Sequence, residues 1–313
     1  MLAMKILALV PGNISDQILF FPALSSLHNT YPQAAIDLVI EPAAADAYQV
    51  CPRFNNLIKF SYNNSNSLTD FGDLLGQVRE QEYSLAFSYD QQWSTSLLLW
   101  LSGIPTRIGS AGSGGAFFYS KTIQPDPAQY QAIFYHDFLR AADVHQPCPP
   151  LNISIAKADL DWAASQCQEL GIKGGYIAIA NDGPTPYPVA QWLKIVQDLH
   201  QKQPNMPILL LANPERQQWV GQMLQSSADV KVAFPERIGQ LAALVAGAKL
   251  LLCPETPVMH LAVAVNTYVI ALVGSTPVGQ ILPAHGRNIG IQSPTGAIAD
   301  ISAEQVLEQV WRG

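Results

Sequence analysis

The sequence is poor in charged residues, which make up only 13% of its 313 positions. Soluble domains carry about 25%, so much of the surface must consist of Ser, Thr, Asn and Gln. The net charge is −7, and positions 1–150 hold 7 Lys and Arg against 12 Asp and Glu. Proteins that bind DNA or RNA neutralise phosphates with a basic face. Nucleic acid is therefore not an expected partner.

Cysteine is also scarce, and its four positions are scattered along the chain: Cys51, Cys148, Cys167 and Cys253. They form no C-x-x-C pair and have no histidine spacing suited to zinc. We therefore expect reduced thiols, a cytoplasmic location and no bound metal. The sequence also lacks Gly-x-Gly-x-x-Gly and Walker motifs. Their absence disfavours a dinucleotide oxidoreductase or an NTPase, and no cofactor is expected.

Long apolar runs are missing too, since none approaches the roughly 20 residues that a membrane-spanning helix needs. The N-terminal stretch MLAMKILALVPG is apolar, but it lacks the basic segment and the small-residue cleavage site of a signal peptide. We interpret it as the first strand of the fold. Any contact with a membrane is expected to be peripheral, at its inner face.

The sequence does contain a regular alternation of short apolar runs with helical stretches. The first half includes KILALV, AIDLVIE and SLAFSYD, and the second half includes YIAIAND, ILLLANP, KLLLCPE and TYVIALVG. Apolar strands alternating with helices predict a parallel sheet covered on both faces. Between the halves, PCPPLNISI has three prolines in four residues, which suits an extended connector. We predict an α/β protein of two Rossmann-like, doubly wound domains, 1–150 and 151–313.

The loop after the first predicted strand contains Gly12, Asn13 and Asp16. Open parallel sheets bind ligands beyond the carboxyl ends of their strands, so this loop is a candidate site. Asp16 also stands at the start of a predicted helix. A carboxylate there can cap the helix and complement its dipole, a stabilisation of about 0.5–2 kcal/mol. Position alone leaves both roles open.

The second half contains a longer candidate segment, CPETPVMHLA at positions 253–262, which is followed by the strand VIALV and by GSTP. A strand, a turn and a helix N-terminus together form a diphosphate site, because unpaired backbone N–H groups and the helix dipole point at the anion. Thr256, Pro257 and Val258 fall in that first helical turn. His260 lies one turn further in, where it could contact a ligand or pack in the core.

Three further positions carry two interpretations each. Arg107, in LSGIPTRIG, is either a surface strand residue or a ligand contact, and His136 opens a helix that it could cap. Glu215 follows the strand ILLLA in the loop NPER. A carboxylate after a Rossmann strand can bind ribose hydroxyls, and one at a helix start can also serve as the N-terminal acid.

Taken in order from Gly12 to Pro283, these segments resemble glycosyltransferase family 9, the ADP-heptose:lipopolysaccharide heptosyltransferases of GT-B fold. The resemblance implies two domains facing a cleft, the first binding the acceptor and the second the donor. It implies that Asp16 is the catalytic base and that Gly12, Asn13 and Arg107 lie on the acceptor side. The donor-binding residues that it implies are Thr185, Glu215, Glu255, Thr256, Pro257, Val258, Met259, His260 and Thr276.

The sequence departs from the family pattern at several of its key positions. Ser15 replaces a Gly, and Glu255 replaces an Asp, which lengthens the carboxylate by one methylene. Pro257 replaces a Gly, so one N–H that could bind phosphate is missing. Thr185 stands where the family has a Lys that neutralises the sugar nucleotide. The candidates for a substitute cation are Lys194, Arg216 and Arg237.

The resemblance therefore implies an inverting glycosyltransferase of the heptosyltransferase type. It would transfer a sugar from a nucleotide-diphospho-sugar, with ADP-heptose as the expected donor, to a glycan or a lipid-linked, lipopolysaccharide-like acceptor. A second hypothesis is a diverged protein on the same fold that binds sugar nucleotides with weak or no catalysis. The missing Lys and Pro257 favour the second hypothesis, whereas Asp16, Met259 and His260 favour the first.

Overall fold

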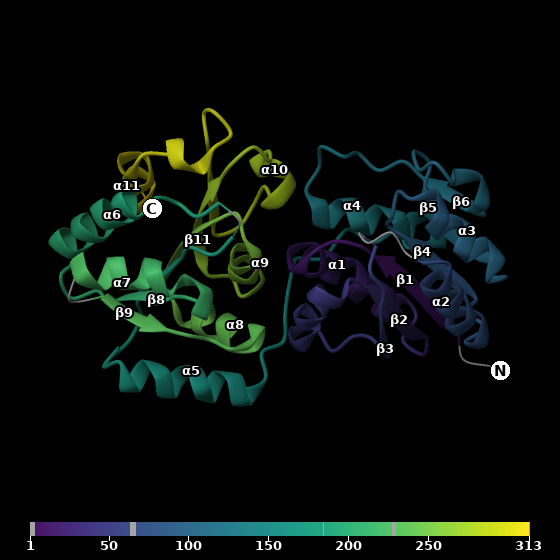
Figure 1. Ribbon diagram of the computed structural model, residues 1–313, viewed down its shortest axis with the longest axis horizontal. Coiled ribbons are helices and arrows are strands. Elements are labelled where there is room, and N and C mark those ends of the chain that lie inside the picture. The colour runs from purple at the N-terminus through teal and green to yellow at the C-terminus, as the bar shows by residue number, and fades with distance from the viewer. Residues whose placement is uncertain (1–3, 63–66, 184, 227–229, 313) are drawn as a thin grey trace. The chain divides into compact units, whose positions relative to one another are not determined.

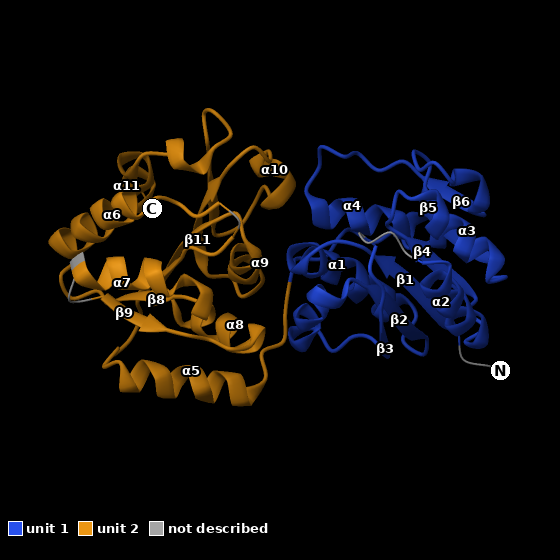
Figure 2. Cartoon of the chain, in the orientation of Figure 1, with its two compact units in different colours: residues 1–151 blue, residues 152–313 orange. Residues whose placement is uncertain are grey.

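The computed structural model describes residues 4–62, 67–183, 185–226 and 230–312. The chain forms two compact units, Met1–Leu151 (unit 1) and Asn152–Gly313 (unit 2), which Figure 2 shows in blue and orange. The division falls within the proline-rich segment PCPPLNISI, residues 147–155. Among the described residues, no helix combines the length and the apolar character that crossing a bilayer requires.

Unit 1 is built on six parallel strands in the order β3-β2-β1-β4-β5-β6 (Figure 1). The strands are β1 (Lys5–Val10), β2 (Ala35–Ile40), β3 (Asn56–Lys59), β4 (Leu85–Ser88), β5 (Thr106–Ser110) and β6 (Lys121–Ile123). The helices are α1 (Ile14–Thr30), α2 (Leu68–Glu80), α3 (Trp93–Leu101) and α4 (Gln131–Asp137), with 3-10 turns η1 (Pro42–Val50), η2 (Ala116–Phe118) and η3 (Phe138–Ala142).

Unit 2 has a second sheet of six parallel strands, in the order β12-β11-β10-β7-β8-β9. The strands are β7 (Ile177–Ala180), β8 (Ile208–Leu211), β9 (Val230–Ala233), β10 (Leu250–Pro254), β11 (Tyr268–Val273) and β12 (Asn288–Gln292). The helices are α5 (Lys157–Glu169), α6 (Val189–Lys202), α7 (Gln217–Ser226), α8 (Ile238–Gly247), α9 (Pro257–Ala264), α10 (Val278–Ile281) and α11 (Ala303–Arg312), with 3-10 turns η4 (Pro214–Arg216) and η5 (Ile298–Asp300).

The two sheets share one topology. Numbered within its own unit, each runs in the order third, second, first, fourth, fifth, sixth, which is the order of a doubly wound Rossmann sheet. The predicted class of two Rossmann-like units is therefore confirmed. In each sheet the winding reverses between the first and the fourth strand, which is between β1 and β4 in unit 1 and between β7 and β10 in unit 2.

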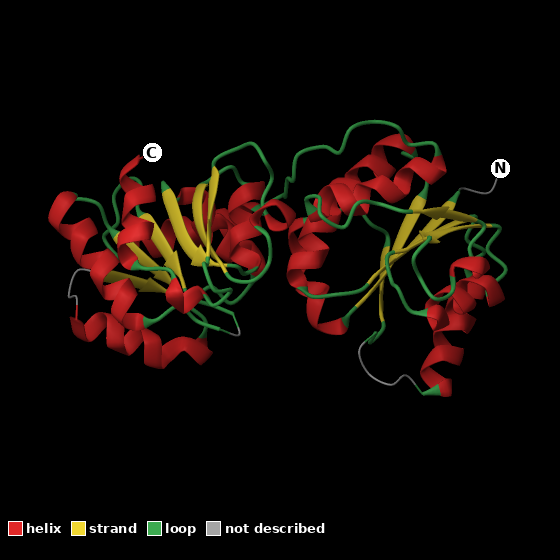
Figure 3. Ribbon diagram, turned by 90° about the horizontal axis from the view of Figure 1, so that it is seen from above, coloured by secondary structure: helices red, strands yellow, loops and turns green. Residues whose placement is uncertain are grey.

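The central strands of each sheet, such as β4, β7, β8 and β10, are buried along their whole length because helices cover both faces. In β7, Ile177 and Ile179 pack with Trp192 of α6 on one face, whereas Ala178 and Ala180 pack with Met259 of α9 on the other. Figure 3 shows helices on both sides of the strands. Burying both faces leaves the strand ends and their loops as the exposed parts of each sheet, so ligand chemistry belongs to the loops.

Candidate functional site

Asp16 lies in the loop that follows β1, at the point in unit 1 where the winding reverses. It is the third residue of α1 and completes a capping box, because its Oδ2 accepts a hydrogen bond of 2.8 Å from the Asn13 N–H. The Asn13 side chain in turn accepts from the Ser15 N–H at 2.7 Å. The helix-capping role of Asp16 is therefore present in the structure. Its role as a catalytic base stays a prediction.

Gly12 has a structural reason to be glycine. Its φ is +101°, a conformation that residues with a Cβ rarely adopt. A methyl group built on Gly12 would also collide with the Asp16 carboxylate. The Asp16 carboxylate therefore occupies the space that a side chain at position 12 would fill, so a glycine at this position is what leaves room for it.

The surroundings of Asp16 favour its action as a base. Its Oδ1 accepts a hydrogen bond of 3.2 Å from the Tyr135 hydroxyl. Burial raises the pKa of the Asp16 carboxyl above its usual value, although the Asn13 N–H and the Tyr135 hydroxyl lower it in part. A carboxylate with a raised pKa accepts a proton more readily than an exposed one.

Two other residues singled out in unit 1 bond to the protein itself. The Arg107 guanidinium donates to the backbone carbonyls of Phe118 and Ile104, at the amino end of β5 and so at the edge of the sheet opposite to Asp16. The buried His136 ring lies 2.9 Å from the Ser26 hydroxyl, between α4 and α1. The structure gives both side chains a packing role, and it does not bring Arg107 near Asp16.

Unit 2 has a cavity of about 570 Å³ at the carboxyl ends of β7, β10 and β11. This position, at the reversal between β7 and β10, is where open α/β sheets bind ligands, and the volume is typical of small-molecule sites. Four loops contribute to it. The cavity is lined by Asp182, Gly183, Thr185, Pro186, Pro254, Glu255, Gly274, Ser275, Gly296, Ala297, Ile298 and Ala299.

Two carboxyl groups face this cavity from neighbouring loops. Burial raises the pKa of Asp182 above its usual value, and the Arg216 guanidinium lowers it in part. The Asp182 Oδ1 is buried and has no hydrogen-bond partner in the described part of the chain. Burial also raises the pKa of Glu255, and the Thr276 hydroxyl lowers it in part. The predicted residues Glu255 and Thr276 are thus brought together.

The three candidate cations lie in different places. The Arg216 guanidinium donates to the carbonyl of Gly183, in the loop that lines the cavity. Arg237 pairs with the buried Asp159. Lys194 and Glu304 form an exposed ion pair of 3.9 Å. Arg216 is therefore the one candidate of the three that contacts the cavity wall.

Helix α9 begins beside the cavity, with Thr256 at its N-cap and Pro257 at its first position. The Met259 N–H bonds to the Thr256 carbonyl at 3.0 Å. Met259 and Val258 are buried. Of the remaining predicted donor residues, Thr185 lines the cavity, and Glu215 is exposed in η4, directly before Arg216.

His260 is buried, with 2% of its surface exposed. Burial lowers its pKa to about 4, so the ring is neutral at pH 7. Its Nδ1 has no hydrogen-bond partner among the described residues. A buried nitrogen without a partner is costly unless a ligand or water supplies one.

Comparison with known proteins relates this geometry to a family. Residues 72–311 match the sequence model of glycosyltransferase family 9 (heptosyltransferase). The chain belongs to glycosyltransferase family 9. It is 23% identical to lipopolysaccharide heptosyltransferase 3 of Escherichia coli, over 83% of this chain and 81% of that protein. It is also 20% identical to the photosynthetic NDH subunit of subcomplex B 1 of Arabidopsis thaliana, over 97% of this chain and 73% of that protein.

Solved structures of family 9 have the same fold. A family 9 glycosyl transferase from Veillonella parvula superposes with a TM-score of 0.84 at 17% identity, covering 99% of this chain and 96% of that one. An Escherichia coli heptosyltransferase solved with ADP superposes with a TM-score of 0.76 at 15% identity, over 99% and 97% of the two chains. The predicted GT-B fold class is confirmed.

Within this family 9 chain, Pro257 fits its helix. Proline is favoured at the first helical position, because the N–H there has no helical partner and the fixed φ suits the helix. What Pro257 removes is one amide that could bind an anion. The Met259 N–H already bonds to Thr256, so the Val258 N–H is a candidate amide for an anion at this end of α9.

The sequence reasoning missed Asp182 as a site residue of this family 9 chain. Asp182 follows β7 in the turn NDGP, and such a turn composition predicts only a loop. Its position after the first strand of unit 2, at the reversal point, was the signal that could have found it. Among the described residues, no group of three or more His, Cys, Asp or Glu side chains is placed to hold a metal ion.

His260 should make the stability of the protein pH-dependent. Its pKa is lowered in the fold from 6.5 to about 4, so the stability that it contributes is fully present above its unfolded pKa and is lost as the pH falls from about 6.5 to 4. Between pH 7 and pH 4.5 this one group should cost about 2–3 kcal/mol of unfolding free energy. Urea unfolding gives the difference in unfolding free energy between pH 7 and pH 4.5. In His260→Gln this difference should be smaller than in the wild type by about 2–3 kcal/mol. The matched control is His285→Gln at an exposed histidine, and an equal pH difference in both variants would contradict the prediction.

Proposed function

We propose that the chain is an inverting glycosyltransferase that moves a sugar from a nucleotide-diphospho-sugar to a hydroxyl group of a glycan or lipid-linked acceptor. Unit 2 binds the donor and unit 1 binds the acceptor. ADP-heptose is the first candidate donor, since relatives of this chain are named lipopolysaccharide heptosyltransferases and one similar structure was solved with ADP. The observation that carries the proposal is the cavity at the reversal between β7 and β10, with Arg216 against its wall.

The charges around the cavity indicate where the sugar, the diphosphate and the ribose of the donor would bind. Asp182 and Glu255 would repel a diphosphate, but carboxylates accept hydrogen bonds from sugar hydroxyls. The diphosphate therefore belongs at the start of α9, near the Val258 N–H, with Arg216 neutralising its charge. The neutral His260 ring offers its Nδ1 to a donor hydroxyl or a water. Glu215, at the end of β8, takes the ribose hydroxyls.

In the proposed reaction, Asp16 removes the proton of the acceptor hydroxyl as the hydroxyl oxygen attacks the anomeric carbon. A new carbon–oxygen bond forms, the bond from that carbon to the phosphate oxygen breaks, and configuration at the carbon is inverted. The nucleotide diphosphate leaves with the electron pair, and Asp16 ends protonated. Positive charge at the diphosphate stabilises the leaving group.

A screen of nucleotide-sugars by thermal shift tests the proposal. A donor at 100 times its Kd stabilises the native state by about 2.7 kcal/mol, which corresponds to a rise in Tm of roughly 5–10 °C for a unit of this size. We expect such a rise with one nucleotide-diphospho-sugar and with its nucleotide diphosphate, and not with the free sugar. If no member of the panel raises the Tm, the donor site is not where we place it.

Thr185 gives a second test, because it lines the cavity where the family has a Lys. Introducing Thr185→Lys into an Arg216→Ala background should restore a cation to the cavity wall. One charged hydrogen bond is worth about 1.5–3 kcal/mol, so calorimetry should show donor affinity recovering by roughly tenfold or more. Thr185→Gln in the same background is the uncharged control. Equal affinities in the two double variants would place the diphosphate away from residue 185.

The second candidate function is a binding protein without transferase activity. It is favoured by the relative that is named as an NDH subunit and by the loss of the family Lys at Thr185. The two functions differ in one measurement. The measurement is the release of nucleotide diphosphate from a donor that binds. Release in the presence of an acceptor indicates transfer, whereas no release with any acceptor tested indicates the second function.

A further inference from the structure

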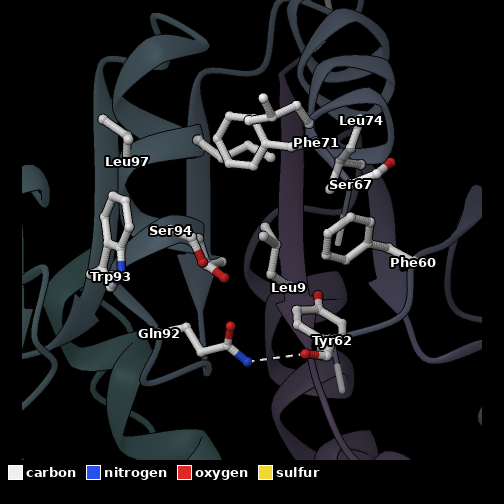
Figure 4. A pocket seen from close by; sticks show the side chains of 13 residues that line it. Leu9, Phe60, Tyr62, Ser67, Phe71, Leu74, Gln92, Trp93, Ser94 and Leu97 are labelled. Carbon is white, nitrogen blue, oxygen red and sulfur yellow. Dashed lines mark hydrogen bonds between the residues drawn. The ribbon is translucent and has the colours of Figure 1, made fainter. Parts of the chain in front are cut away.

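Unit 1 has its own cavity, of about 360 Å³, on the face of the sheet opposite to the α1–α4 pair. Figure 4 shows its two walls, with Trp93, Ser94 and Leu97 of α3 on one side and residues of α2 on the other. Leu9, near the carboxyl end of β1, lies between them. The cavity therefore opens at the same edge of the sheet as the Asp16 loop, and its volume falls within the roughly 300–1,000 Å³ of small-molecule sites.

The lining of this cavity is largely apolar, and four of its polar side chains, those of Tyr62, Ser67, Gln92 and Thr95, are already bonded to the protein. The Gln92 amide donates to the Tyr62 carbonyl at 3.1 Å, and the Tyr62 hydroxyl donates to the Val39 carbonyl at 3.0 Å. The Thr95 hydroxyl donates to Asp90. A ligand that needs hydrogen bonds would lose those that it makes with water and gain few in return. Hydrocarbon has no such cost.

The charges around the cavity also favour a hydrocarbon ligand. Among the described residues, no Lys, Arg, Asp or Glu lines the cavity, and the charged groups bonded to its lining are three carboxylates. Glu41 accepts from the Tyr62 N–H at 2.6 Å. Asp90 accepts from Thr95, and Asp70 accepts from Ser67 at 2.8 Å. An uncharged cavity flanked by carboxylates disfavours a phosphate or carboxylate ligand and matches an uncharged chain.

The apolar surface continues outward from the cavity. At its rim, the Leu68 side chain is 92% exposed and that of Trp93 is 60% exposed. Large exposed apolar side chains gathered at one opening indicate a ligand or interaction site, whereas single scattered ones need no explanation. A peptide segment would bring backbone N–H and C=O groups that require partners here, which a hydrocarbon chain does not.

We propose that this cavity binds a hydrocarbon chain of the acceptor, so that the acceptor is a lipid-linked sugar held by its chain in unit 1. The inference rests on the proposed function for the identity of the ligand, and on the cavity alone for its hydrocarbon nature. The chain would lie between α2 and α3, and the sugar would leave the cavity at the edge of the sheet that carries Asp16.

Alkyl maltosides test this proposal, because they join an uncharged sugar to a chain of chosen length. We would titrate the full-length protein by calorimetry with octyl, decyl and dodecyl maltoside, each below its micelle concentration. Burying methylene groups should strengthen binding by roughly tenfold for every two groups added, until the cavity is full. Affinity that does not change with chain length would overturn the proposal.

Ser94→Phe would fill the cavity from α3, and it should weaken decyl maltoside binding by at least tenfold. Ser84→Phe makes the same change at an exposed position at the opposite edge of the sheet and should bind like the wild type. Trp93→Gln, at a largely exposed residue, should weaken binding severalfold and serves if Ser94→Phe does not fold. Equal affinities in all variants, or binding to phosphatidylcholine vesicles without binding of monomeric maltosides, would overturn the proposal.

The same variants separate this inference from the proposed function. Binding of the nucleotide-sugar found by thermal shift should be unchanged in Ser94→Phe, because that donor occupies unit 2. If wild-type protein binds alkyl maltosides but no nucleotide-sugar, the proposed function fails and the chain-binding cavity stands. If it binds a nucleotide-sugar but no alkyl maltoside, the cavity proposal fails alone.

Discussion

Asp16→Asn is expected to lower the rate of transfer by roughly 10²–10⁴-fold, the usual effect of removing a general base. Donor affinity should stay within about threefold of wild type, because we propose that the donor binds to unit 2. Asn keeps the size of the side chain and an oxygen that can accept from the Asn13 N–H, the bond that closes the capping box. The measurement is the steady-state release of nucleotide diphosphate with a saturating donor and acceptor.

A matched control separates catalysis from helix capping. Asp70 closes a capping box with Ser67 at the same position of α2, so Asp70→Asn removes the same kind of charge from a helix start. Both variants should lower the Tm to a similar small extent, since such caps contribute about 0.5–2 kcal/mol. Because Asp70 bonds to Ser67 at the proposed acceptor cavity, transfer is compared at saturating acceptor, where a change in acceptor affinity has no effect. Under that condition only Asp16→Asn should lose transfer. Transfer in Asp16→Asn within threefold of wild type would show that this carboxylate is a cap and nothing more.

Arg216→Ala is expected to weaken donor binding by roughly tenfold to a hundredfold, the worth of one charged hydrogen bond. Arg216 contacts the loop that lines the cavity in unit 2. Its guanidinium is thus the cation best placed to replace the lysine that the family carries at residue 185. Calorimetry with the nucleotide diphosphate alone measures the effect without requiring turnover.

Arg237→Ala, in contrast, should lower the stability of the protein and leave its donor affinity unchanged. Arg237 pairs with Asp159, whose side chain is buried, so its removal leaves a buried carboxylate without its partner and should lower the stability of unit 2. Donor affinity should be unchanged once the protein is folded. Lys194→Ala should change neither quantity, because its ion pair with Glu304 is exposed and such pairs contribute little. A loss of donor affinity in Arg237→Ala equal to that in Arg216→Ala would reject our assignment.

The fold could be predicted from the sequence because the central strands are apolar on both faces. Runs such as ILLLA and KLLLC have no alternative to a sheet covered on both sides, and the connectors contain the glycines and prolines that end helices and strands. The loops of the candidate site could be predicted for the same reason, since the carboxyl ends of parallel strands lie at one edge. Thr185 and Glu255 were predicted from the resemblance to family 9, and both line the cavity in unit 2.

Residues whose surroundings come from distant parts of the chain could not be predicted. The burial of Asp182 and its interaction with Arg216 depend on how the loops after β7 and β8 fold together. The bonds of Arg107 to the Phe118 and Ile104 carbonyls depend on the turn at η2. Local sequence patterns carry no signal for such contacts. The apolar cavity between α2 and α3 was missed for the same reason.

The identical strand order of the two units has a consequence for how such a protein can change over generations. Each half keeps its own hydrophobic core and offers its own set of strand-end loops, so under the proposed function the two substrates would be recognised by separately heritable pieces. Substitutions between α2 and α3 would then give the chain a new acceptor while the loops after β7 and β10 stay unchanged. Hybrids that join the first half of one relative to the second half of another, spliced in the proline-rich connector, should inherit acceptor preference from one parent and donor preference from the other.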